Sequence, residues 1–401
     1  MKKSQWIMGL IVLAALAALA LWARTRIHFD FHVFAAQIAH VDWRRIAAAV
    51  ACIYLAYVFR AIRWARLMRH NLEVPTFSLI GTQMIGFTTV ALIGRVADPV
   101  RPFLVSRKTG AELSSQIAVY IVERLLDAGS MALIFSVSML WVSSDEILSA
   151  TRTGLMAHLA PQNHELAILV ARYGGLFLTL LGAVFLFMIR LAGGAVASFF
   201  ERAFGLISKN MGHAIGHKIR AFHAGLDTIH SLSDFLTVAG LSLIMWLTIA
   251  LAYFMTCTAF VASPELAAIS LPKTVLLMVA SGTVSIIQLP VIGWFSQIGL
   301  VAVAIGGILH APAEAATACS TTLLLATFLC VIPAGLIWAQ FDHVNLRKVA
   351  VESEHAEEVL AEEEQRADAA QQSDVSFAPA DSSRCEIIPY RPAEQDNGDK
   401  R

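Results

Sequence analysis

The stretch GRVADPVRPFLVSRK occupies residues 94–108 and separates two long apolar segments of the chain. It combines charge with helix-breaking residues, a combination that apolar segments rarely contain. A proline lacks the backbone donor of a helix and restricts the residue before it, so two prolines here predict an interrupted helix. Either the stretch lines a polar cavity or it is a cytoplasmic surface loop, and its composition favours neither. Its charged residues and prolines are Arg95, Asp98, Pro99, Arg101, Pro102, Arg107 and Lys108.

The surrounding composition indicates an integral membrane protein. Of the 401 residues, 57% are hydrophobic and 15% are charged, and the mean hydropathy is +0.64. A soluble domain carries about 25% charged residues. The formal net charge of zero hides a separation: residues 351–401 hold 14 acidic and 5 basic residues, and the other 350 hold 16 and 25. A body of charge +9 suits anionic lipid headgroups, and a tail of charge −9 is typical of a solvated, disordered segment.

Hydropathy predicts an all-α, polytopic membrane protein. A spanning helix needs about 20 apolar residues, and six segments meet or approach that length. We interpret the first as a retained span rather than a signal peptide, because its apolar run ends in Leu-Trp-Ala-Arg instead of a polar cleavage region. Two further apolar regions, 77–105 and 273–311, are interrupted by glycine and proline. The six predicted spans are 6–23, 46–59 (extended by the apolar face of 60–68), 116–142, 166–189, 236–261 and 314–340.

The distribution of Lys and Arg predicts the orientation of these spans. Basic residues mark four segments as cytoplasmic, whereas the loops 143–165 and 262–272 contain only Arg152 and are predicted to be external. The loop 24–45 departs from the pattern with four arginines. On this topology the two interrupted regions form broken or re-entrant helical hairpins of opposite sense, which is compatible with an inverted repeat. The predicted cytoplasmic segments are 60–69, 107–108, 190–235 and 347–348.

The chain is predicted to contain a transmembrane domain, residues 1–345, and an acidic, disordered cytoplasmic tail, residues 346–401. Within the first, the apolar spacing of about 199–232 predicts an interfacial amphipathic helix. His213 and His217 lie four residues apart in it, but no third ligand accompanies them, so no metal site is predicted. No cofactor is expected either. The cysteines in apolar runs are predicted to be buried and without a chemical role, namely Cys52, Cys257, Cys319 and Cys330.

Three charged residues lie inside the predicted span 116–142: Glu123, Arg124 and Asp127. A charge near the bilayer centre costs roughly 2.5–3.5 kcal/mol on insertion scales, so these residues must be paired or hydrated. Arg124 and Asp127 are three apart and can pair, but Glu123 and Asp127 share a face and repel each other. A second cation is therefore expected from the arginines of 94–107. The cluster is either a structural clamp or the wall of a headgroup-binding cavity, and we favour a mixture of the two.

These residues carry a resemblance to a known family. The stretch 94–127, GRVADPVRPFLVSRKTGAELSSQIAVYIVERLLD, resembles the transmembrane region of lysylphosphatidylglycerol synthases, also called the flippase-like domain. That family shows a Gly-Glu-x-x-Arg-like stretch, a linker and a helix with Glu-Arg-x-x-Asp. Arg101 matches the motif arginine, and Glu123, Arg124 and Asp127 match the helix motif.

A second family signature, a Pro/Gly-rich element of the C-terminal half, is matched by 288–299, QLPVIGWFSQIG. The resemblance covers residues 45–340. It implies hinge or structural roles for Pro99, Pro102, Pro290 and Gly293. Two departures concern the substrate more than the fold: the family's Gly-Glu is Ala97-Asp98 here, and the glycine-rich run contains the bulky Trp294-Phe295.

The resemblance and the charge pattern together predict translocation of a phospholipid or lipid-linked headgroup across the cytoplasmic (inner, plasma) membrane. Arginine suits phosphate because its planar fork donates two parallel hydrogen bonds, so Arg95 and Arg101 are expected to face the ligand. Partners are an anionic or phosphate-bearing lipid, the bilayer and, as candidates, enzymes of envelope biosynthesis; no nucleic acid is expected. The C-terminus is predicted to be cytoplasmic. The predicted binding residues are Arg95, Asp98, Arg101, Glu123, Arg124, Asp127, Gln288 and Gln297.

Two alternatives remain open at the level of sequence. A membrane-embedded lipid-modifying transferase would use Asp98 or Glu123 as a base. However, we find no catalytic motif and no soluble aminoacyltransferase domain, so the protein is not predicted to be an enzyme. A scaffold for envelope-lipid enzymes would use the acidic tail, 351–401, as its docking element.

Overall fold

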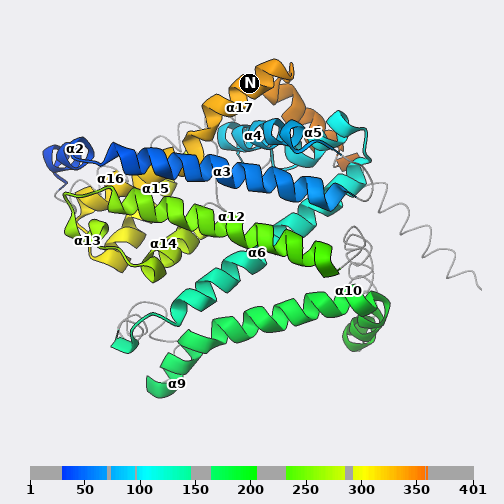
Figure 1. Cartoon of the computed structure of the whole chain (residues 1–401), viewed down its shortest axis with the longest axis horizontal. Helices are drawn as coiled ribbons and strands as arrows, with labels where there is room; N and C mark the ends of the chain where they lie inside the picture. Colours follow the sequence, from blue (N-terminus) through cyan, green and yellow to red (C-terminus); the bar gives the residue numbers. More distant parts are fainter. Residues whose placement is uncertain are drawn as a thin grey trace, which may run out of the picture. The chain divides into compact units, whose positions relative to one another are not determined.

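The computed structural model describes residues 29–69, 74–94, 97–145, 164–205, 232–284, 292–356 and 358–359, and within these ranges the chain is helical with no strand (Figure 1). Its helices agree with the predicted all-α class. In chain order they are α2 (Phe31–Ala39), α3 (Trp43–Met68), α4 (Thr76–Ile93), α5 (Val100–Thr109), α6 (Leu113–Met139), α9 (His164–Leu169), the π-helical turn η2 (Val170–Gly174), α10 (Gly175–Gly205), α12 (Leu232–Thr258), α13 (Pro264–Ala267), α14 (Leu271–Val284), α15 (Ile292–Leu309), α16 (Ala313–Leu324), the π-helical turn η4 (Leu325–Leu329) and α17 (Val331–Phe341).

Four of these helical segments are long and apolar enough to cross a membrane: Trp43–Met68, Thr76–Ile93, Ser233–Thr258 and Ala313–Phe341. α6 has 27 residues but contains the three charged residues noted above. The chain is thus a multi-pass membrane protein. The predicted first span, 6–23, lies outside the described residues, and the total of six spans and the inverted repeat stay predictions.

Glycine and proline divide the interrupted region 77–105 into two helices, as their positions predict. Gly94 ends α4 with φ 101°, a conformation that glycine adopts without steric cost. α5 then begins after Pro99 and has Pro102 in its first turn, where the backbone N–H groups have no partner within the helix. Gly110, with φ 72°, ends α5 in the left-handed conformation. The second interrupted region also contains two helices, α14 and α15, but the residues between them, 285–291, are outside the described part.

Glycines allow α17 to lie close against α4. A β-carbon at Gly335 would lie 2.6 Å from the carbonyl oxygen of Met84, and one at Gly81 would lie 2.6 Å from Cε3 of Trp338. Such small-residue contacts let helices approach closely where lipid replaces water. Elsewhere α3 and α12 lie side by side, and α6 crosses beneath them (Figure 1). These contacts bring α3, α4, α5, α6 and α12 together around one set of polar side chains.

The remaining domain predictions fall partly on undescribed residues. The amphipathic helix predicted for about 199–232 overlaps the end of α10, and its residues 206–231 are not described. The predicted tail, 346–401, begins with helical residues 346–356, in which Val349 and Ala350 are buried. By its internal contacts the chain divides into residues 1–354 and 355–401.

Candidate functional site

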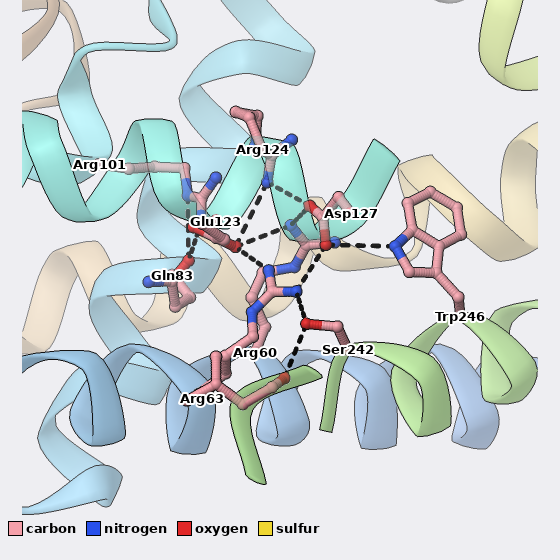
Figure 2. A network of polar contacts seen from close by, with 10 residues as sticks. Arg60, Arg63, Gln83, Arg101, Glu123, Arg124, Asp127, Ser242 and Trp246 are labelled. Atoms are coloured by element: carbon pink, nitrogen blue, oxygen red, sulfur yellow. Dashed lines mark hydrogen bonds and ion pairs between the residues drawn. The ribbon is translucent and has the colours of Figure 1, made fainter. Parts of the chain in front are cut away.

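Two carboxylates of α6 form the centre of a buried ionic network (Figure 2). Glu123 and Asp127 lie one helical turn apart and therefore face the same side. They are only 1% and 5% exposed. Four arginines surround the pair: Arg60 and Arg63 from α3, Arg101 from α5 and Arg124 from α6 itself.

Arg63 bridges the two carboxylates and is itself fully buried. Its Nη2 lies 2.6 Å from Glu123 Oε1, and its Nη1 lies 2.6 Å from Asp127 Oδ1. From α12, Ser242 Oγ accepts a hydrogen bond from Arg63 Nη1 at 2.7 Å, and Trp246 Nε1 donates to Asp127 Oδ1 at 3.2 Å. One guanidinium therefore connects α3, α6 and α12.

Arg101 has a partly aromatic environment. Its Nη2 lies 2.7 Å from Glu123 Oε2, and its Nε and Nη2 donate to Gln83 Oε1 of α4 at 3.0 and 2.6 Å. The absence of a side chain at Gly86 of α4 leaves room for the Arg101 stem. Contacts of this kind between a cation and ring faces are attractive. The rings of Phe87, Trp64 and Tyr120 have centroids 4.5, 5.2 and 5.4 Å from the guanidinium carbon.

Arg60 and Arg124 complete the network on its less enclosed side. Arg60 Nη1 lies 3.1 Å from Glu123 Oε1 and 3.4 Å from Asp127 Oδ2. Arg124 Nη2 lies 2.9 Å from Asp127 Oδ2 and 3.3 Å from Glu123 Oε1. The side chain of Arg124 is 35% exposed, whereas those of Arg63 and Arg101 are at most 1% exposed. Arg124 is therefore the network arginine that a ligand reaches most easily.

The network carries more cations than anions. Four guanidinium groups face two carboxylates, and Asp98, which lines the same cavity as Arg124, adds a third carboxylate. The counted groups still have a net charge of +1. Desolvated charge of one sign is unfavourable unless a counter-charge lies close to it. The accessible edge of the network is consequently a favourable position for an anion.

A cavity of about 210 Å³ borders this edge. Two of its walls come from the interrupted regions of the sequence: Asp98 precedes α5, and Gln297 belongs to α15. The π-helical turn η4 contributes Thr327 and Phe328; turns of this type are frequent at functional sites. The remaining lining is mixed: polar or charged Arg60, Arg124, Tyr57, Tyr253 and Ser281, with apolar or aromatic Ile53, Ala56, Phe87, Val90, Trp246, Ile249, Met278 and Gly282.

The structure thus brings many of the predicted binding residues together. Asp98, Arg124 and Gln297 line the cavity, while Arg101, Glu123 and Asp127 belong to the network behind its wall. Gly293 lies in the first turn of α15. Arg95, Gln288 and Pro290 lie outside the described residues. Since Gln83, Glu123 and three rings surround Arg101 here, its predicted contact with a ligand stays a prediction.

Sequence reasoning placed Arg60 and Arg63 in a cytoplasmic segment and did not predict their part in the network. Both lie within α3 and are buried, 8% and 0% exposed, whereas Arg66 and Arg69 of the same run are exposed. Arg101 and Arg124 already balance the two carboxylates of α6 in charge, so no charge imbalance in the sequence pointed to two further arginines.

The structure also describes the cysteines and the groups of side chains that could bind a metal. Among the residues described, no group of three or more His, Cys, Asp and Glu side chains has the arrangement of a metal site. Cys257 and Cys319 are buried with their Sγ atoms 3.8 Å apart, and Cys52 and Cys330 are half-buried. The histidines His213 and His217 fall in a range that the structure does not describe.

The fold and the site define a multi-pass helical membrane protein with a buried arginine–carboxylate network beside a cavity of mixed polar and apolar lining. The chain belongs to the family described as the lysylphosphatidylglycerol synthase TM region, whose model matches residues 6–335. Membership links the protein to the modification or translocation of membrane lipids. Comparison with curated proteins and with solved structures gave no match.

Proposed function

We propose that this protein binds an anionic or phosphate-bearing lipid and translocates its headgroup across the cytoplasmic membrane. The observation that carries the proposal is the accessible guanidinium of Arg124, which lines a cavity at the edge of a network with excess positive charge. The family supports a lipid as the ligand. The proposal includes a plasma-membrane location, a cytoplasmic C-terminus and no chemical step at the site.

Arg124 is suited to exchange its present partners for a phosphate. Asp127 also accepts from Arg63 and Trp246, and Glu123 also pairs with Arg63 and Arg101, so neither carboxylate depends on Arg124 alone. The guanidinium can therefore turn toward the cavity without leaving a carboxylate unpaired. Its two parallel donors match two phosphate oxygens.

The cavity lining also offers a hydrogen-bond acceptor for a hydroxylated or amine-bearing headgroup. Tyr253 donates to Ser281 Oγ at 3.0 Å, so this pair is already satisfied. Gln297 is 8% exposed, and its Oε1 has no hydrogen-bond partner among the described residues. A buried acceptor without a donor is costly. A hydroxyl or ammonium group of the headgroup, or a water molecule, would satisfy it.

Translocation requires the cavity to open to each side of the membrane in turn. The helical structure is interrupted beside the cavity, because α4 ends at Gly94 and α5 begins only after Pro99. Irregular backbone at membrane depth is tolerated where it borders protein or a wet cavity. We propose that α15 moves relative to α3, α4, α5, α6 and α12, which the network holds together.

Reconstitution into liposomes tests the proposal. With fluorescent phosphatidylglycerol as the probe, wild-type protein should make lipid of the inner leaflet accessible to an external quencher. Arg124→Gln should reduce this rate at least tenfold, because the variant keeps polarity but loses the charge and the fork. The control is Arg66→Gln, which changes an exposed arginine of α3 outside the network. Equal rates in Arg124→Gln and wild type would contradict the site assignment.

The alternatives predict different results in the same vesicles. A lipid-modifying transferase predicts a new lipid product, detectable by mass spectrometry, that disappears in Asp98→Asn. A scaffold predicts wild-type lipid behaviour for the Arg124 variant and loss of its effect on partner enzymes after deletion of residues 351–401.

A further inference from the structure

The cavity beside the network is called the charged cavity, because Arg60, Asp98 and Arg124 line it. A second, apolar cavity lies along some of the same helices. It has a volume of about 690 Å³ and is lined by the later part of α6, by α12 and by the beginning of α14. That volume is within the range of about 300–1,000 Å³ that is usual for ligand sites. Only two of its eleven lining residues carry a polar side chain, Ser138 and Ser270. Apolar walls are formed by Ile134, Val137, Leu243, Leu247, Leu271 and Val275.

On α6 and α14 the apolar cavity follows the charged one, whereas on α12 the two linings alternate, with Leu243 and Leu247 at the apolar cavity and Trp246 and Ile249 at the charged one. On α6, Arg124 lines the charged cavity and Leu133 is the first residue of the apolar one. Nine residues of helix correspond to about 14 Å. On α14 the charged cavity begins at Met278 and the apolar cavity ends at Val275. α6, α12 and α14 contact one another, so the two cavities share one three-helix wall.

On α6, the flexible side chain of Met131 lies between Arg124 of the charged cavity and Leu133 of the apolar one, and it contacts α14. A β-carbon at Gly282, which lines the charged cavity, would lie 2.9 Å from Cε of Met131. Met131 precedes Leu133 of the apolar cavity by two residues. Methionine has three rotatable bonds and adapts to irregular space, so this contact can open without movement of the backbone.

We propose that the apolar cavity holds one acyl chain of the lipid whose headgroup occupies the charged cavity, with Met131 as the movable side chain between them. This inference rests on the proposed function. Charge and polarity argue for this occupant: a single molecule with an anionic head and an apolar chain matches two adjacent cavities of those characters. A free phosphate ion or a soluble sugar phosphate would leave the apolar cavity unused. Binding should therefore depend on acyl-chain length.

The test compares two probes of one headgroup, dihexanoyl and dioleoyl phosphatidylglycerol, on the full chain in mild detergent. Leu247→Trp places a large ring into the apolar cavity from an exposed position, because Leu247 is 49% exposed. We expect it to weaken binding of the dioleoyl probe about tenfold and to change binding of the dihexanoyl probe less than twofold. The control is Leu251→Trp, an equally apolar exposed residue one turn further along α12 that lines neither cavity. It should leave both affinities unchanged.

The outcomes separate this inference from the proposed function. Arg124→Gln should weaken both probes to a similar degree, because it acts on the shared headgroup. Unchanged dioleoyl binding in Leu247→Trp, with Arg124→Gln still deleterious, would overturn the acyl-chain site and leave the headgroup site intact. Equal binding of a zwitterionic dioleoyl lipid would show general lipid association and overturn both. Failure of both anionic probes to bind wild type would also overturn both.

Discussion

Two regions of the molecule are held together by opposite means. Around Glu123, five helices meet through ion pairs and hydrogen bonds of 2.6–3.4 Å. Around Leu277, the helices α12, α14, α15 and α16 meet through apolar side chains such as Phe260 and Ile305, which are fully buried. The first region borders the charged cavity, and the second borders its far wall.

The difference matters because the solvent of these helices is lipid. An apolar side chain gains little by leaving lipid for a protein interior, so close packing is the main source of stability in the apolar region. A charged side chain in lipid is costly, and its partners are available in only one arrangement of the helices. The network should therefore tolerate change less than the apolar cluster does.

The largest effect should follow from removal of the central carboxylate. Glu123→Gln leaves four guanidinium groups facing only Asp127 within the network, and removing one partner from a buried ionic cluster costs about 3–5 kcal/mol. We expect a large drop in the temperature at which the protein aggregates in detergent, measured by fluorescence-detected size-exclusion after heating. Glu112→Gln is the matched control, since Glu112 precedes the same helix and is exposed. Similar stability of the two variants would contradict a structural role for the network.

A smaller effect is expected where the network is displaced without loss of charge. A β-carbon at Gly86 would clash with Cγ of Arg101, so Gly86→Ala must move this arginine away from Gln83 or Glu123. Overpacking of this kind costs about 1–3 kcal/mol. In the same heating assay, the aggregation temperature of Gly86→Ala should lie between those of wild type and Glu123→Gln. Gly129→Ala on α6, where a β-carbon meets nothing within 4 Å, should be neutral or slightly stabilising, because alanine has the higher helix propensity. A drop equal to that of Gly86→Ala would contradict displacement of Arg101 as the cause of the loss.

The sequence predicts the parts of this site that local rules govern. The cost of charge in a spanning helix led to the expectation of a partner for Glu123 from 94–107, and Arg101 fulfils it. The conformational preferences of glycine and proline predicted the interruption between α4 and α5. The family resemblance is confirmed as well. The interruption depends on residue type and near neighbours alone, and the pairing of Arg101 with Glu123 joins segments only 22 residues apart.

The parts that the sequence missed depend on distant contacts. The last arginines of α3 and its C-cap recur every three residues, at Arg60, Arg63, Arg66 and Arg69. This spacing does not show which of them are buried and which lie at a basic, solvent-exposed end of the helix. Arg63 is buried against α6 and α12, where its partners Asp127 and Ser242 are 64 and 179 residues away in the sequence. Neutral polar residues of apolar helices, such as Gln83, gave no indication of their partners either.

The smallest effect should come from the apolar region and completes the comparison. Leu277→Ala removes a side chain that is 1% exposed from α14. In a water-soluble core such a change costs about 2–5 kcal/mol, part of it the transfer of apolar surface from water. Here the unfolded side chain remains in lipid, so mainly the packing contribution is lost and we expect roughly 1–2 kcal/mol. Denaturant titration in mixed micelles, followed by tryptophan fluorescence, measures the change in the free energy of unfolding. A cost as large as that of Glu123→Gln would show that apolar packing and the ionic network hold the helices equally, and that the comparison made here is wrong.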